Sequence, residues 1–101
     1  MEIMEYPKVE PARYNSAEIN GIAARIVIGK EQGSVNFCMR VFEFAPDGFT
    51  RRHSHDWEHE MFIHQGRGEI LNNGQWHPIC AGNAVFIPEN EELQIRNSSD
   101  D

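Results

Sequence analysis

The sequence has little cysteine, little positive charge and no long apolar run. Its 101 residues include two cysteines, Cys38 and Cys80, which lie far apart and outside any Cys-x-x-Cys pattern. That spacing excludes a zinc knuckle or a redox pair. We therefore expect two reduced, partly buried thiols, because free cysteine behaves as a small hydrophobic residue.

Positive charge is scarce: 9 Lys and Arg stand against 16 Asp and Glu, for a formal net charge of -7. Without a basic stripe to neutralise phosphates, we expect neither nucleic acid nor an anionic membrane as a partner. Residues 1–16 carry charges and no apolar run, which excludes a secretory signal, and no later stretch is long enough to span a bilayer. The sequence predicts a cytoplasmic protein.

What the sequence does contain is a series of short apolar, β-branched or aromatic runs between turn residues, typical of an all-β barrel or sandwich. The chain is long enough for one compact domain. The predicted strands are Ala23–Ile28, Val35–Ala45, His59–His64, Glu69–Leu71, Trp76–Cys80, Ala84–Ile87 and Leu93–Arg96. We predict turns at 29–33, 46–48, 66–68, 72–74, 81–83 and 88–90. Asn73-Gly74 predicts a type I′ hairpin, because both residues tolerate positive φ.

The two ends of the chain differ from this strand pattern. We interpret residues 1–16 as an N-terminal arm, which either adds an edge strand or stays mobile, and residues 17–101 as the barrel domain. Only a short polar segment follows the strand predicted at 93–96. We therefore expect the closing strand to be missing or truncated, or the edge to be covered by the arm or a second subunit.

The histidines are clustered, and His53, His55 and His59 form the pattern His-x-His-x-x-x-His. In an extended segment His53 and His55 project from the same side, about 6 to 7 Å apart. His59 opens the next predicted strand and could complete a set of three imidazoles from there. Neutral imidazole suits zinc, iron, copper or nickel, and together with a carboxylate also manganese. The pattern predicts a site for one divalent transition metal.

Glu60 is the alternative third ligand, but adjacent residues of a strand face opposite sides, so only His59 or Glu60 should face the barrel. We choose His59 as the ligand. Glu60 is then a candidate catalytic base, or an acceptor that orients a ligating histidine. Arg40 and Arg96 are candidates for binding a substrate carboxylate.

At this point the sequence resembles the cupin family, over roughly residues 21–97. The first cupin motif resembles Gly48 to Gly66, with its His-x-His at His53 and His55 and its glutamate at Glu60. The second motif resembles Gly82 to Asn97, including Pro88. The resemblance implies an all-β, cupin-type double-stranded β-helix, which is a small jelly-roll-like barrel.

The segment 54–60 is most similar to small bacterial and archaeal cupins whose metal is bound by four histidines. The resemblance carries over His53, His55 and His59 as ligands of one divalent metal, which would be Mn, Fe, Zn, Ni or Cu. Leu93 stands where the family has its last ligating histidine. His64 and His77 are candidate substitutes, but a water or substrate oxygen in the open position is the simpler proposal.

Two functions follow from this site. The first is a metal-dependent enzyme of the oxygenase, isomerase or lyase type, acting on a small organic molecule inside the barrel. The second is a non-catalytic module that binds or senses a small ligand with a degenerate metal site, which Leu93 favours. The resemblance also implies a homodimer. We expect the barrel to be lined by apolar side chains, namely Phe37, Met39, Phe42, Phe62, Phe86 and Ile95.

Overall fold

The structure, a computed structural model, describes residues 1–34 and 36–99. In the described part, the regular elements are strands and two short 3₁₀ turns, η1 (Tyr6–Lys8) and η2 (Lys30–Gln32). The strands are β1 (Ala12–Asn15), β2 (Asn20–Ile28), β3 (Met39–Phe49), β4 (His59–Phe62), β5 (Arg67–Asn72), β6 (Gln75–Cys80), β7 (Ala84–Ile87) and β8 (Leu93–Arg96). None of the helical segments in these ranges has the length and hydropathy to cross a membrane.

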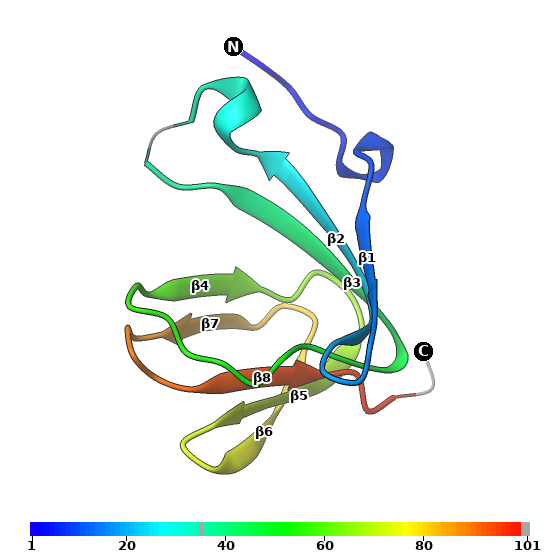
Figure 1. Ribbon diagram of the computed structural model, residues 1–101, viewed down its shortest axis with the longest axis vertical. Coiled ribbons are helices and arrows are strands. Elements are labelled where there is room, and N and C mark those ends of the chain that lie inside the picture. Colours follow the sequence, from blue (N-terminus) through cyan, green and yellow to red (C-terminus); the bar gives the residue numbers. More distant parts are fainter. Residues whose placement is uncertain (35, 100–101) are drawn as a thin grey trace.

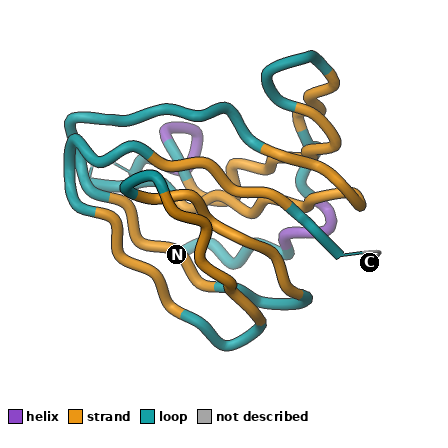
Figure 2. The backbone as a smooth tube through the Cα atoms, turned by 90° about the horizontal axis from the view of Figure 1, so that it is seen from below, coloured by secondary structure: helices purple, strands orange, loops and turns teal. Residues whose placement is uncertain are grey.

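The strands form two antiparallel sheets (Figure 1). The larger sheet has the order β1-β2-β3-β8-β5-β6, and the smaller sheet pairs β4 with β7. Sequential neighbours such as β5 and β6 pair directly, whereas β3 and β8 meet across a long stretch of sequence. In the view of Figure 2 the strands run side by side and are joined mostly by loops at their ends. The predicted all-β, jelly-roll-like barrel is confirmed.

The core lies between the β4–β7 pair and the β5–β6–β8 end of the larger sheet. Its buried members are Ile70, Ile79, Ile87 and Leu93, and half-buried Met61, Ile63, Val85 and Ile95 pack against them. Each buried aliphatic side chain contributes roughly 1.5 to 3 kcal/mol to folding. The cluster therefore holds the two sheets together beside the strand that begins with His59.

All seven predicted strands are present as β2 to β8; β7 and β8 have the predicted bounds, and the others have shifted ends. The strand predicted at 35–45 starts at Met39 instead, and its first residue, Val35, lies outside the described residues. Of the two alternatives for the arm at residues 1–16, the added edge strand is the one found at residues 12–15, where β1 lies at the edge of the larger sheet and pairs antiparallel with β2 of the same chain. The bounds of this strand were not predicted. Polar and small side chains dominate β1, so it lacks the apolar pattern by which the others were found.

The turn predicted at residues 46–48 is wrong, because β3 continues through these residues as a bulged strand. The register with β2 jumps from Ile22 opposite Phe44 to Asn20 opposite Phe49. The extra residues bend the strand, and Asp47 takes a φ of 62° within the bulge. The residues predicted as a turn thus change the direction of β3, which then runs toward β8.

The hairpin predicted at Asn73-Gly74 is confirmed. Both residues have positive φ, 52° and 77°, as a type I′ turn requires. Asn72 and Gln75 on either side are paired across β5 and β6.

The expected apolar lining of the barrel is wrong for all but Ile95. Phe37, Phe62 and Phe86 have exposed fractions of 72%, 67% and 57%. Phe62 and Phe86 lie on the alternate positions of β4 and β7 that point away from the core, while Met39 and Phe42 are exposed on β3. The thiols Cys38 and Cys80 are also exposed, in contrast to the expected partial burial.

The β3 bulge is held by close backbone packing against Gly21. Gly21 has a φ of 67°, and a methyl group on its Cα would lie 3.0 Å from Cα of Gly48 and 3.2 Å from Cβ of Ala45. Gly74 has a similar φ of 77°, but an added methyl group there would meet nothing within 4 Å. The two glycines share the same backbone requirement and differ in crowding.

We predict that Gly21→Ala destabilises the protein more than Gly74→Ala. Both changes place a side chain in the left-handed region at a cost of about 1 to 2 kcal/mol. Gly21→Ala adds overpacking against the bulge, which costs a further ~1 to 3 kcal/mol. Urea unfolding of the two variants measures the difference directly. Equal losses of stability would mean that the bulge has room for the methyl group.

Candidate metal centre

The segment that follows β3 is held on β8 by main-chain hydrogen bonds. His53 and Leu93 exchange both of their main-chain bonds, with N···O distances of 3.0 and 2.8 Å. Farther along, the Asn90 amide donates to the His55 carbonyl oxygen at 2.6 Å. These bonds anchor the backbone at both histidines, from where their side chains reach the same side of the barrel wall.

The imidazole rings of His53, His55 and His59 form one cluster. The ring centroids of His53 and His55 are 4.6 Å apart, and those of His55 and His59 are 4.8 Å apart. His59 is the first residue of β4 and pairs with buried Ile87 of β7. All three histidines are half-buried. The structure therefore brings together the three residues that the motif singled out.

Half-buried and exposed side chains alternate along β4, and the choice of His59 over Glu60 assumed this alternation. His59 and Met61 are half-buried and Met61 packs against the core, whereas Glu60 and Phe62 are exposed. Glu60 consequently lies outside the histidine cluster. Its carboxylate lies beside Glu58, and the hydrogen bond between the two side chains, with the charge of Glu60, raises the pKa of Glu58.

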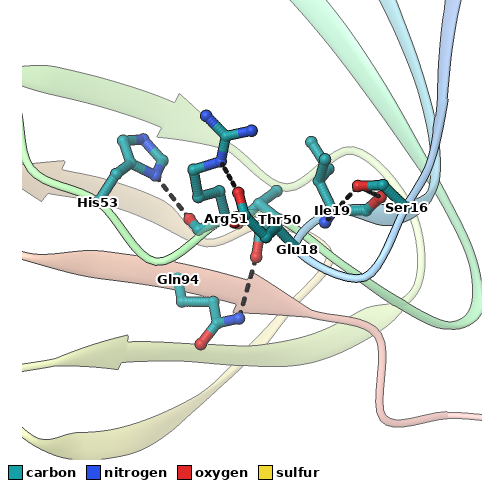
Figure 3. A network of polar contacts seen from close by, with 7 residues as sticks. All are labelled: Ser16, Glu18, Ile19, Thr50, Arg51, His53 and Gln94. Atoms are coloured by element: carbon teal, nitrogen blue, oxygen red, sulfur yellow. Dashed lines mark hydrogen bonds and ion pairs between the residues drawn. The ribbon is translucent and has the colours of Figure 1, made fainter.

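A hydrogen bond to the main chain fixes the protonation of the His53 ring (Figure 3). Its Nδ1 lies 2.6 Å from the carbonyl oxygen of Arg51, which can only accept, so Nδ1 carries the proton and donates it. The Nε2 atom of the neutral ring then has a free lone pair. Bonds of this kind to a carbonyl are the usual support of a metal-binding histidine.

The same segment is tied to its surroundings by further polar contacts. The Arg51 guanidinium pairs with Glu18 at 3.1 Å, and the Gln94 amide donates to the Thr50 carbonyl oxygen at 3.0 Å (Figure 3). One contact reaches back to the loop after β1 and the other to β8. Together they limit movement of the backbone just before His53.

Trp57 was not identified from the sequence as part of this site. Its indole stacks on the His55 ring, with centroids 4.4 Å apart and an interplanar angle of 10°. In residues 1–34 and 36–99 no group of three or more His, Cys, Asp or Glu side chains stands ready to hold a metal ion. The rings touch, but their nitrogen atoms do not yet converge. A tryptophan two residues after His-x-His was the available signal.

The surroundings of His55 and His59 favour their neutral forms. Burial lowers the pKa of His55, and the nearby charges of His53 and Arg40 lower it further, against a smaller opposing effect of Asp56. Burial is also the main cause of the lowered pKa of His59, followed by His55, His53 and Arg40. Neutral imidazole is the form that binds a metal.

Leu93 lies directly across from His53, so its side chain is on the same face of the sheet. It is 3% exposed and belongs to the core cluster. Leucine thus fills with apolar surface the position from which a histidine would face the imidazoles. This geometry agrees with the motif comparison, in which residue 93 replaces a ligand.

The other residues considered from the sequence lie outside the cluster. His64 and His77 are exposed, and the His64 ring meets the edge of Tyr6 at a centroid distance of 6.4 Å. The Arg96 guanidinium lies 3.7 Å from the centroid of the Trp76 ring and pairs with Glu69 at 2.9 Å. Arg96 is therefore already engaged.

A hollow of about 480 Å³ lies on another part of the molecule. Its lining residues are Asp47, Phe49, Trp76, Gln94, Arg96, Asn97 and Ser98. None of the histidines lines it, and its only cation, Arg96, is paired. Among the described residues its lining includes the carboxylate of Asp47 but none of the imidazoles, so the hollow is separate from the histidine cluster.

Comparison with known proteins places these features in a family. The family model described as "Cupin domain" matches residues 40–101, which include the histidine cluster and Leu93. No curated protein sequence matches the chain. The family match confirms the resemblance seen in the two motifs.

Solved structures of the same fold include the polyketide cyclase RemF from Streptomyces resistomycificus, at a TM-score of 0.89 and 25% identity, covering 96% of this chain and 70% of that one. A predicted oxalate decarboxylase from Thermotoga maritima matches with a TM-score of 0.83 and 24% identity, over 96% of this chain and 88% of that one. A sugar phosphate isomerase from Silicibacter pomeroyi matches with a TM-score of 0.80 and 18% identity, over 98% and 69%.

We predict that the metal-free protein loses stability as the pH falls. The pKa of His55 and of His59 in the folded chain is below the ordinary value of 6.5, so the unfolded chain binds more protons in the window between. This contribution to stability is complete above pH 6.5 and is lost as the pH falls through the lowered values. Urea unfolding in the presence of a chelator, between pH 5 and pH 8, measures the slope.

The matched variants for that experiment are His55→Gln with His59→Gln, and His77→Gln on β6 as the control. The double variant should flatten the slope, whereas the control should keep it. An unchanged slope in the double variant would show that other groups cause the pH dependence.

Proposed function

Since the chain belongs to the cupin family, we propose that it holds one divalent transition metal with His53, His55 and His59 and acts on a small organic molecule at that metal. The observation that carries the proposal is the contact of the three imidazole rings on the core side of the barrel. The donors are therefore three neutral nitrogen ligands, a set that suits zinc, iron, copper or nickel.

The His53 and His55 rings differ in how they are prepared for binding. The His53 ring is held with Nε2 free, because its Nδ1 is bonded to the Arg51 carbonyl oxygen. The His55 ring is stacked on Trp57, and in the proposed metal-bound state it turns away from the indole toward the other two imidazoles. An aromatic stack contributes roughly 0.5 to 1.5 kcal/mol. Binding of a structural zinc ion contributes about 10 to 16 kcal/mol, so the stack yields to the metal.

A bound metal of this type supplies Lewis-acid polarisation of a substrate oxygen. The protein's own residues supply the rest of the site. His53, His55 and His59 provide the ligands, and the Arg51 carbonyl keeps the His53 ring in one orientation. Leu93 provides no ligand, so one more position is open to a water or substrate oxygen than in a site with four histidines.

An enzymatic role is supported by the open position and by the similarity to a structure named as a polyketide cyclase. The proposal covers oxygenase, isomerase and lyase chemistry on a small organic substrate. It does not retain Glu60 as the catalytic base, because that carboxylate lies beside Glu58 on the exposed side of β4. A homodimer and a cytoplasmic location, both expected from the sequence, stay within the proposal. The exposed Phe62 and Phe86 support a partner on the β4–β7 face.

A second function is favoured by one observation, the burial of Leu93 at the fourth ligand position. In this alternative the barrel binds or senses a small ligand without catalysis, and the metal is structural or absent. The enzyme requires about one bound metal ion per chain, with coordination positions at which water and substrate can exchange. The binding module requires neither.

We predict that the untagged protein, reconstituted with a first-row divalent metal and desalted, retains about one ion per chain. His59→Ala should reduce this to near zero because it removes a ligand, whereas Glu60→Ala should retain the ion. Metal content is measured by plasma mass spectrometry. If Glu60→Ala lost the ion and His59→Ala retained it, the opposite face of β4 would form the site. A wild-type protein that retained no metal would contradict the proposal.

We also predict that Leu93→His raises metal affinity by about tenfold or more, because the new imidazole faces the cluster from across His53. Affinity is measured by competition with a chromogenic chelator. The matched control is Leu71→His on β5, where the side chain is buried but belongs to the opposite face of the sheet. An equal effect in both variants, or none in Leu93→His, would contradict the assigned geometry.

A further inference from the structure

The hollow beside the end of β8 lies on the face of the larger sheet that is turned away from the histidines. Its volume of about 480 Å³ is within the range of roughly 300 to 1,000 Å³ that small-molecule sites usually have. Gln94, one of its lining residues, follows Leu93 on β8, and adjacent residues of a strand face opposite sides of the sheet. Leu93 faces the core and the His53 side, so the hollow is on the other side.

The register of the strands gathers the lining side chains on this face. Phe49 of β3 pairs with Arg96 of β8. Leu71 of β5 pairs with Gln94 of β8 on one side and with Trp76 of β6 on the other. Paired residues project from the same face of a sheet, and so do residues two positions apart in one strand. Two aromatic rings, an amide and a guanidinium therefore share one surface.

Contacts with Trp76 and Glu69 fix the Arg96 side chain within the hollow. The Arg96 guanidinium lies over the Trp76 ring, 3.7 Å from its carbon to the ring centroid. The Arg96 Nε and Nη2 atoms both contact Oε1 of Glu69, at 3.0 and 2.9 Å. The guanidinium is thus held in one orientation, and its Nη1 atom is left without a hydrogen-bond partner among residues 1–34 and 36–99.

The β3 bulge brings Asp47 to the same hollow. The Asp47 N–H donates to the Asn97 carbonyl oxygen at 3.0 Å, and the Asn97 N–H donates to the Gly48 carbonyl oxygen at 2.8 Å. These bonds hold the bulge, with the Asp47 φ of 62°, against the end of β8. Bulges commonly re-aim a side chain beside a functional site. In the described part of the chain, the Asp47 carboxylate makes no hydrogen bond or ion pair.

The hollow offers both acceptors and donors to a ligand. The Gln94 Nε2 atom donates to the Thr50 carbonyl oxygen at 3.0 Å, which leaves Oε1 of Gln94 free to accept (Figure 3). The Asp47 carboxylate is the other acceptor. The donors are Nη1 of Arg96 and Nε1 of Trp76, for which the described residues provide no acceptor.

This set of groups disfavours a ligand of either charge. An anion would use only the donors, and it would meet the negative charges of Asp47 and Glu69 beside Arg96. A cation would use only the acceptors, and the Arg96 guanidinium already covers a face of the aromatic ring that would attract it. A hydroxyl group both donates and accepts, so several hydroxyls on one neutral molecule satisfy the whole set.

We propose that this hollow binds a neutral polyhydroxylated small molecule, such as a monosaccharide, through hydroxyls bonded to Asp47, Gln94 and Arg96. The C–H side of a sugar ring is apolar and packs against Phe49, which removes apolar surface from water. The site is independent of the proposed metal centre, because none of the histidines lines it. It therefore adds a second ligand class to the proposed function.

The experiment adds D-glucose, D-galactose or myo-inositol to the untagged, metal-free protein and follows amide and indole N–H shifts in ¹H–¹⁵N spectra. At least one of these polyols should shift the signals of residues 47–49, 76 and 94–98. Sodium acetate, ethylammonium chloride and glycine serve as the anionic, cationic and zwitterionic probes. Each of them should bind there at least about tenfold more weakly than that polyol, because it leaves donors or acceptors unpaired or meets a like charge.

Asp47→Gly should weaken binding of that polyol by about tenfold or more, because hydrogen bonds to a charged group are the strong ones. Asp47→Asn should lose less, because the amide retains an acceptor oxygen. Glycine and asparagine both tolerate positive φ, so neither change strains the bulge. The matched control is Asp56→Gly, which removes an exposed aspartate outside the hollow and should keep the full affinity.

The inference would be overturned if none of the three polyols shifted these signals, or if Asp47→Gly and Asp56→Gly lost affinity equally. Binding of acetate, ethylammonium or glycine in the hollow as tightly as the polyol would overturn the assigned ligand class. Because the titrations use metal-free protein, their outcome is separate from that of the metal-content measurements on the histidine cluster.

Discussion

The paired main-chain hydrogen bonds between His53 and Leu93 are the constraint on which the rest of the candidate site depends. They attach the segment after the β3 bulge to β8, and β8 contributes Leu93 to the core. The position of the first histidine is therefore fixed by the same contact that closes the hydrophobic cluster. His59 reaches the cluster from the other sheet, through the pairing of β4 with β7. His53 and His55 meet because they lie two residues apart in one extended segment, and His59 joins them because the two sheets pack on one core.

The chemistry of the histidine cluster depends on which charged side chains stay outside it. The chain is acidic, yet Glu60 of β4 and the acids of the preceding loop, Asp56 and Glu58, are exposed. Burial and the charges of neighbouring groups lower the pKa of His55 and of His59, which favours the neutral form that binds a metal. A centre made of neutral ligands carries the whole charge of whatever cation it holds.

Much of the fold could be predicted from the sequence, because short apolar strands and turn residues carry local signals. The Asn73-Gly74 hairpin is fully encoded by the residues that tolerate positive φ. The bulge at residues 45–48 was predicted as a turn, since local sequence does not show that β2 and β8 pair on either side of it. At the site, the choice of His59 over Glu60 followed from strand alternation alone. The stack of Trp57 on His55 depends on the orientation of the two rings, which strand periodicity does not encode.

The most direct test of the central claim, that the three imidazoles form one metal centre, is anomalous X-ray diffraction from crystals of the untagged protein grown with zinc. Data collected on both sides of the zinc absorption edge locate the ion without reference to its ligands. The account predicts one anomalous peak among His53, His55 and His59, at about 2.0 to 2.1 Å from a nitrogen of each ring, with His55 turned out of its stack on Trp57. A peak bound elsewhere, or no peak with His55 still stacked, would contradict it.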